Sequence, residues 1–134
     1  MAKIKKINHV AIAVSNIEES LTFWRDALGL ELSHIEDVHS QNATVAFLPI
    51  GESDIEIVKP TVEDTGTAKF LRERGQGMHH LCLEVDNIDE MLEHLKEKGI
   101  RLINETPIQL DGRKAAFVHP KSASGVLVEL YQLT

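Results

Sequence analysis

Two histidines and two glutamates occupy matching places in the two halves of this 134-residue sequence. His9 and Glu56 are 47 residues apart, and His80 and Glu129 are 49 residues apart. Imidazole nitrogens and carboxylate oxygens together suit a divalent first-row metal ion. If the halves pack about a pseudo-twofold axis, all four side chains meet in one place. The sequence therefore predicts a metal site made of these four residues.

An internal repeat supports this pairing of residues. His9–Leu21 aligns with His80–Leu92 at an offset of 71 residues, and six of the thirteen aligned pairs are identical. Two later segments continue the match, one within Val45–Leu48 that matches Ala116–Val118 at an offset of 70, and Asp54–Ile57 with Leu127–Leu130. Each half shows strand-like alternation, then a helical pattern, then further strand segments. The repeat predicts two β-α-β-β-β modules.

The strand patterns indicate which side chains face the site. In the first strand, His9 shares a face with the small residues Ala11 and Ala13, because side chains alternate along a strand. Glu56 and Glu129 each interrupt an otherwise aliphatic strand. A half-buried carboxylate needs a partner, and a shared cation supplies one.

The helical patterns also have recognisable ends. Ser15 and Glu18 have capping-box spacing, and Asp86 is predicted to cap the second helix. Gly29 and Gly99 follow the two helices, where a left-handed backbone favours glycine. The first helix is expected to carry one apolar stripe, which comprises Ile17, Leu21, Trp24 and Leu28.

Composition excludes several functional classes. The sequence has 21 acidic and 14 basic residues, for a net charge of −7, and no basic block suits a nucleic-acid backbone. Its longest apolar runs are too short for a membrane span, and no hydrophobic signal core is present near the amino terminus. A single cysteine, Cys82, cannot form an internal disulfide. We expect a cytoplasmic protein that binds neither nucleic acid nor membrane.

The expected organisation is a single domain over residues 1–134. Module 1 spans about residues 5–60 and module 2 about residues 77–134, joined by a linker over about residues 61–76 that contains a helix at Thr67–Arg74. Other potential ligands have simpler interpretations. Cys82 is expected to be a small buried residue, and His79 a structural residue facing away from His80. The remaining histidines considered, His34, His39 and His94, are expected in loops or at the surface.

Five segments resemble the vicinal oxygen chelate superfamily of glyoxalase-like proteins, and within it the methylmalonyl-CoA epimerases. They are Ile7–Val14, Ala68–Gly75, Gly77–Leu81, Ala116–Ser122 and Gly125–Leu130. The resemblance implies an α+β fold, in which two tandem βαβββ modules form a curved mixed sheet around a metal-binding cleft. It also implies a homodimer.

The resemblance further implies the chemistry. His9, His80 and Glu129 match metal ligands of the family, and Glu56 stands where some epimerases have glutamine. The implied reaction interconverts (R)- and (S)-methylmalonyl-CoA by α-proton abstraction and reprotonation through a metal-stabilised enolate. The metal is a divalent ion such as Co²⁺, Zn²⁺, Mn²⁺ or Ni²⁺, and Glu129 is both a ligand and a candidate base. Three basic residues are candidates for contacting coenzyme A, namely Arg113, Lys114 and Lys121.

One departure concerns the base on the opposite face of the substrate. Many relatives carry a Pro-Glu-Gln stretch before the second strand, and some carry a glutamate on that strand. At the corresponding places this chain has His39-Ser40-Gln41 and Val45. The second base is therefore unassigned. Two alternatives remain open: a glyoxalase-type lyase or isomerase acting on a thiol hemithioacetal, and a metal-free resistance module that binds a small molecule.

Overall fold

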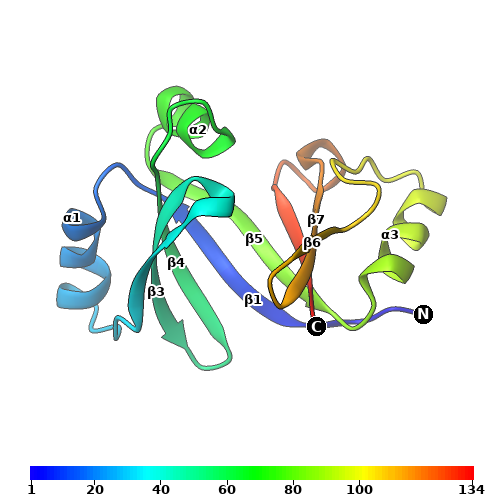
Figure 1. The fold of residues 1–134 in the computed structure, drawn as a ribbon, viewed down its shortest axis with the longest axis horizontal. Helices are drawn as coiled ribbons and strands as arrows, with labels where there is room; N and C mark the ends of the chain where they lie inside the picture. Colours follow the sequence, from blue (N-terminus) through cyan, green and yellow to red (C-terminus); the bar gives the residue numbers. More distant parts are fainter. The chain divides into compact units, whose positions relative to one another are not determined.

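The computed structural model describes all 134 residues and contains two βαβββ modules, as the repeat predicted (Figure 1). The first comprises β1 (Ile4–Ala13), α1 (Ile17–Leu21), η1 (Thr22–Ala27), β2 (His34–Val38), η2 (His39–Gln41), β3 (Ala43–Ile50) and β4 (Ser53–Pro60). The second comprises β5 (Gly77–Val85), α3 (Ile88–Glu97), β6 (Ile108–Leu110), β7 (Arg113–Val118), η3 (Pro120–Ser122) and β8 (Val128–Leu133). Between them in the chain lies α2 (Gly66–Arg74).

Strand pairing is the same in both modules. The strand order is β2-β3-β4-β1 in the first and β6-β7-β8-β5 in the second. In each, the first and last strands of the module are parallel and the other pairs are antiparallel. Glu56 lies opposite Ala11 and Phe47, and Glu129 lies opposite Cys82 and Phe117. Repeat-equivalent residues therefore have equivalent strand partners in the two modules.

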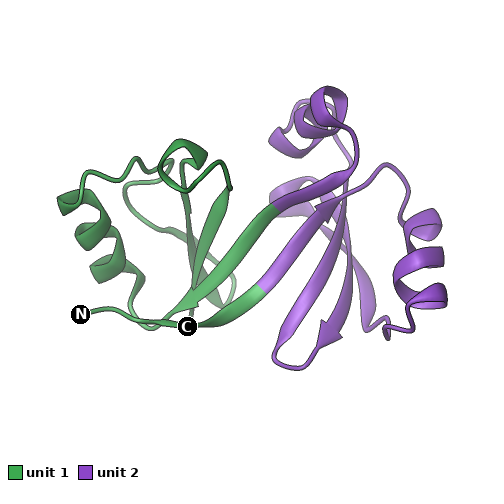
Figure 2. Cartoon of the chain, turned by 180° about the vertical axis from the view of Figure 1, so that it is seen from behind, with its two compact units in different colours: residues 1–8, 80–134 green, residues 9–79 purple.

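Two compact units divide the chain, and their boundary falls inside strands (Figure 2). Unit 1 contains residues 1–8 and 80–134, and unit 2 contains residues 9–79. In unit 1, the backbone N–H of Lys3 donates to the Asp86 carboxylate at 2.8 Å. In unit 2, the backbone N–H and hydroxyl of Ser15 donate to the Gln76 side chain at 2.9 and 3.2 Å. Each unit thus includes the start of the other module's first strand.

Both helical cores form on the faces predicted by strand alternation. In unit 2, α1 packs on a core of Val14, Ile17, Leu21, Ala46, Leu48 and Ile57. In unit 1, the core packed around α3 includes Val85, Ile88, Leu92, Ala116, Val118 and Leu130. The opposite faces of the sheets carry the predicted site residues, because side chains alternate along each strand.

Only part of the apolar stripe on the first helix is buried. Ile17 and Leu21 are buried, whereas Leu28 is 55% exposed. The helix changes to π geometry at Thr22, and the N–H of Leu28 donates to the carbonyl of Phe23, five residues earlier. The wider turn shifts the helical periodicity, so Leu28 leaves the buried face.

The predicted helix caps are also corrected, by one residue in each module. Asn16 accepts from the N–H of Glu19 at 2.9 Å, and Asn87 accepts from the N–H of Glu90 at 3.0 Å. Ser15 and Asp86, the predicted caps, instead bind Gln76 and Lys3. The glycine prediction is confirmed, since Gly29 and Gly99 both have positive φ angles.

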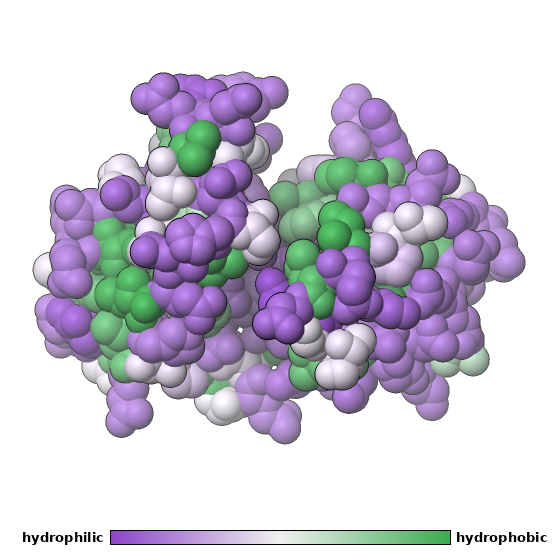
Figure 3. Space-filling view, in the orientation of Figure 1, coloured by the Kyte–Doolittle hydropathy of each residue, from purple (hydrophilic) through white to green (hydrophobic).

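No helix of the structure has the length and apolar character needed to cross a bilayer. In the view of Figure 3, hydrophilic residues predominate and hydrophobic residues gather in patches among them. Exposed apolar side chains on the two long strands include Ile4, Ile7 and Met78.

Candidate functional site

In unit 2, β1 and β4 bring His9 and Glu56 together. These strands are parallel neighbours, and His9 Nδ1 lies 3.1 Å from Glu56 Oε2. His9 is only 1% exposed, and the Glu56 side chain is 15% exposed. His9 is also the first residue of its unit, so the pair lies where β1 passes from one unit to the other.

In unit 1, β5 and β8 bring His80 and Glu129 together in the same way. His80 Nε2 lies 3.0 Å from Glu129 Oε1. In this pair the glutamate is the more buried residue, whereas in the other pair it is the histidine. Glu129 is deeply buried, and the His80 side chain is 13% exposed. His80 is the first residue of unit 1 on β5. The structure thus places each predicted histidine beside the predicted glutamate of its own module.

The donor atoms of these pairs fit a divalent cation. Each pair offers an imidazole nitrogen and a carboxylate oxygen, which are ligands for Mn²⁺, Co²⁺, Ni²⁺ and Zn²⁺. A buried carboxylate is costly unless a positive or hydrogen-bonding group faces it. Within each unit the imidazole meets this need, and it remains close enough to share a metal with the carboxylate.

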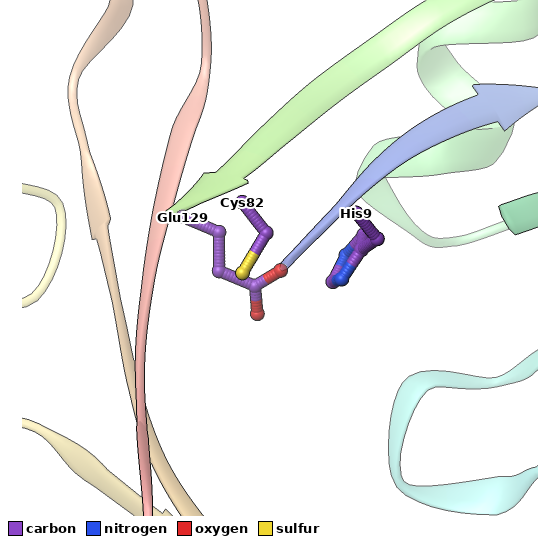
Figure 4. Close-up of side chains that lie close together, drawn as sticks. All are labelled: His9, Cys82 and Glu129. Carbon is purple, nitrogen blue, oxygen red and sulfur yellow. The ribbon is translucent and has the colours of Figure 1, made fainter. Parts of the chain in front are cut away.

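Cys82 is the second neighbour of Glu129 in unit 1. The two residues are register partners on β5 and β8, and their ligand atoms lie within 4.8 Å of each other. Figure 4 shows the Cys82 sulfur and the Glu129 carboxylate side by side. Cys82 is fully buried, in agreement with the sequence-based interpretation.

Two further side chains, Tyr131 and Arg113, lie on the same face of unit 1 as Glu129. The sequence did not predict that they contact each other. Tyr131 packs in a buried cluster with Cys82 and Ala115. The guanidinium carbon of Arg113 lies 5.1 Å from the centre of the Tyr131 ring. The signal for Tyr131 was available in the sequence, because it shares strand parity with Glu129.

The other two basic candidates lie elsewhere in unit 1. Lys114 is on the opposite face of β7, and its Nζ pairs with Asp89 Oδ2 at 3.0 Å. Lys121 is in η3, where its backbone N–H donates to His119 Nδ1 at 3.0 Å. Desolvation, with the positive charges of Arg101 and Lys121, lowers the pKa of His119. Of the three candidates, only Arg113 shares a face with Glu129.

The inner face of unit 2 is apolar around its histidine–glutamate pair. Ala11, Ala43, Val45 and Val58 form a buried cluster there. Val45 is 1% exposed and offers no acid–base group. The other stretch considered for the second base, His39-Ser40-Gln41, forms the exposed η2 turn. The structure therefore leaves the second base unassigned as well.

The remaining histidines have ordinary contacts. His34 is exposed as predicted but lies on strand β2 rather than in a loop, where it stacks on Phe47 with ring centres 4.6 Å apart. His79 meets the Phe70 ring of α2 edge-on at 5.2 Å. His94 lies in the last turn of α3. His79 thus has the packing role that the sequence predicted.

Comparison with known proteins identifies a family. Residues 8–117 match the model of the Glyoxalase/Bleomycin resistance protein/Dioxygenase superfamily. The chain is 39% identical to the mitochondrial methylmalonyl-CoA epimerase of Mus musculus over 97% of its length and 74% of the relative's. It is 37% identical to an ethylmalonyl-CoA/methylmalonyl-CoA epimerase of Cereibacter sphaeroides, over 97% of this chain and 99% of that one.

A solved structure agrees with these sequence relatives. It is a methylmalonyl-CoA epimerase in complex with methylmalonyl-CoA and NH₄⁺, and it has a TM-score of 0.88 and 29% identity to this chain. The match covers 98% of this chain and 96% of that one. The similarity therefore extends over both modules.

Proposed function

The chain belongs to the Glyoxalase/Bleomycin resistance protein/Dioxygenase superfamily, and on this premise we propose that it is a metal-dependent methylmalonyl-CoA epimerase. Similarity to epimerases over 97% of this chain supports the reaction. The observation that carries the metal dependence is the duplicated histidine–glutamate pair, at 3.1 Å in one unit and 3.0 Å in the other.

The proposed metal ligands are His9 and Glu56 from one module and His80 and Glu129 from the other. Both pairs are mostly buried, which keeps their donor atoms oriented and limits competition from water. A bound divalent cation would act as a Lewis acid for negative charge that develops on the substrate.

Glu129 is the proposed base for one face of the substrate's α-carbon. Its carboxylate is 3.0 Å from His80, so the imidazole holds it in a fixed orientation. Removal of the α-proton by Glu129 and return of a proton to the opposite face would invert the carbon. The group that returns this proton is unassigned.

Arg113 and Lys121 are the proposed contacts for anionic groups of the substrate, since Lys114 is engaged with Asp89. A net charge of −7 repels an acyl-CoA at long range, so local cations are needed to bind it. The homodimer and the cytoplasmic location remain predictions from the sequence.

The deciding experiment is hydrogen exchange at the α-carbon of methylmalonyl-CoA in D₂O. We expect the purified protein to catalyse exchange with Co²⁺ or another divalent ion, and to lose it after chelation. Absence of metal-dependent exchange would refute the proposal. Isomerisation of methylglyoxal with a thiol would support the glyoxalase-type alternative, and failure to retain any metal would support a metal-free binding module.

A further inference from the structure

His34 and Glu36 on β2 form another histidine–glutamate pair in unit 2, separate from the proposed metal ligands. The two residues are two positions apart on one strand, so their side chains share a face of the sheet. His34 Nε2 lies 3.5 Å from Glu36 Oε1, and the two side chains are 53% and 55% exposed. This is a pair of titratable groups that the proposed reaction has not yet used.

Strand register places this pair on the same face as Glu56. His34 is the register partner of Phe47, and Phe47 is the register partner of Glu56. Partners on adjacent strands point to the same side of the sheet. Glu36 is in turn the partner of Val45, which belongs to the buried cluster of the inner face. The pair therefore lies on the inner face of unit 2, on its edge strand.

Two contacts hold the His34 imidazole in one orientation. Its ring stacks on Phe47, with ring centres 4.6 Å apart and planes at 16°. Ser33 Oγ lies 3.0 Å from Nδ1, within hydrogen-bond distance. The contact of Nε2 with Glu36, at 3.5 Å, is longer than an ordinary hydrogen bond. Nε2 is therefore the ring nitrogen that can transfer a proton to another atom.

The second module has no counterpart of His34. Phe117 is the repeat equivalent of Phe47, and its neighbours are Ile103 and Asn104. The backbone N–H of Ile103 donates to the Phe117 carbonyl at 2.9 Å, and Asn104 Oδ1 accepts from the Phe117 N–H at 2.8 Å. Neither side chain titrates. The second module instead supplies the proposed base Glu129, so each module has one proton-transfer group that the other lacks.

We propose that His34 returns the proton that completes the epimerisation, and that Glu36 stabilises its protonated form. The proposal rests on the proposed function. In one direction, Glu129 takes the α-proton, and the electron pair of the broken C–H bond passes into the thioester as an enolate. His34 Nε2 gives its proton to the α-carbon from the opposite face, which forms the new C–H bond and leaves a neutral imidazole.

The reverse direction uses the same two groups with their roles exchanged. Neutral His34 takes the α-proton, and protonated Glu129 returns one to the other face. An imidazole suits both directions, because its neutral and protonated forms are both accessible near neutral pH. Proton exchange with water restores the starting forms of both groups after each turnover.

The test separates the two faces of the substrate. (R)- and (S)-methylmalonyl-CoA are incubated separately in D₂O with the Co²⁺-loaded protein, and deuterium incorporation and inversion are measured for the wild type and His34→Gln. This variant keeps Glu129, so one enantiomer should still exchange its α-proton, with retention of configuration. Exchange of the other enantiomer, and inversion of both, should fall by about 100-fold or more.

Two further variants are compared with His34→Gln. His39→Gln replaces another exposed histidine of the same module, in the η2 turn, and should behave as wild type. Glu36→Gln retains the imidazole, so its loss should be one-sided in the same way but only about fivefold, the size expected for an exposed ion pair.

Three outcomes would overturn the proposal. Equal losses for both enantiomers would mean that His34 serves the fold, and undiminished inversion would mean that it transfers no proton. The one-sided loss in His39→Gln alone would assign the proton transfer to the η2 turn. Cobalt content, measured by elemental analysis, should be unchanged in His34→Gln. The proposed function is judged separately, because it fails if the wild type exchanges neither enantiomer.

Discussion

The two modules repeat the same backbone register, yet they differ in what surrounds the shared pair. Next to Glu56 stand Ala11 and Val58, whereas next to Glu129 stand Cys82 and Tyr131. The buried partner also differs, being the histidine in unit 2 and the glutamate in unit 1. The modules thus share the histidine–glutamate pair but not the residues around it. We therefore expect the two pairs to have unequal roles.

The largest effect is expected from His80→Ala. Removing this imidazole deletes a proposed ligand and leaves Glu129 buried without its partner, so metal retention and α-proton exchange should both fall by at least about 100-fold. Elemental analysis and the exchange assay measure these losses. His94→Ala on α3 is the control and should behave as wild type. Full exchange activity in His80→Ala would remove His80 from the site.

The comparison between modules is sharpened by replacing each glutamate with glutamine. Glu129→Gln removes the proposed base, and exchange should fall by about 10²- to 10⁴-fold. Glu56→Gln removes only a charge from the less buried carboxylate, and a loss of about 10-fold or less is expected. Equal losses, measured under metal-saturating conditions, would contradict the assignment of unequal roles.

The two cores are expected to contribute equally to stability. Leu21 and Leu92 are fully buried at repeat-equivalent places, and truncation of either to alanine should cost about 3 kcal/mol. Because β1 and β5 each contribute residues to both units, urea unfolding should remain a single transition in either variant. A transition that splits in one variant would show that the units unfold independently.

A smaller effect tests the helix caps. Asn16→Ala and Asn87→Ala should each reduce the free energy of unfolding by about 1 kcal/mol, because each asparagine accepts a backbone N–H at 2.9 to 3.0 Å. The comparison variant is Ser40→Ala, in the exposed η2 turn. Unchanged urea midpoints in the two cap variants would show that these hydrogen bonds do not stabilise the helices.

The smallest effect is a titration. The pKa of His119 is lowered by desolvation and by Arg101 and Lys121, so folding disfavours its protonated form. His119 therefore lowers the free energy of unfolding as the pH falls below the ordinary histidine pKa of about 6.5. Above that pH it has no such effect. NMR titration should give a midpoint below this value. Lys121→Met should raise the midpoint, and an unchanged midpoint would rule out the lysine's influence.

The sequence was sufficient for the module pattern and for both histidine–glutamate pairs, because identical residues recur at a nearly constant offset. Parity along β5 also identified Cys82 correctly as an inward, buried residue. Features that depend on distant partners were not predictable in the same way. Ser15 has the composition of a cap, but its hydroxyl binds Gln76, 61 residues away.

The exposed position of Leu28 and the Arg113–Tyr131 contact show two further limits. A change from α to π geometry alters helical periodicity without any glycine or proline to signal it. The contact joins two strands whose relative register becomes known only when the sheet forms. The sequence pattern therefore predicted the histidine–glutamate pairs, which occur in both modules. It did not predict the π turn or the Arg113–Tyr131 contact, each of which occurs in one module only.

Each unit includes the first residues of the other module's first strand, and this arrangement has an evolutionary consequence. A chain of half this length would contain one module, and the first residues of its first strand would pack on another copy. The ancestral form implied by this geometry is a two-chain assembly that became one gene by duplication and fusion. Fusion replaces a concentration-dependent association with an intramolecular one. It also frees the two copies to diverge, which an assembly of identical chains cannot do.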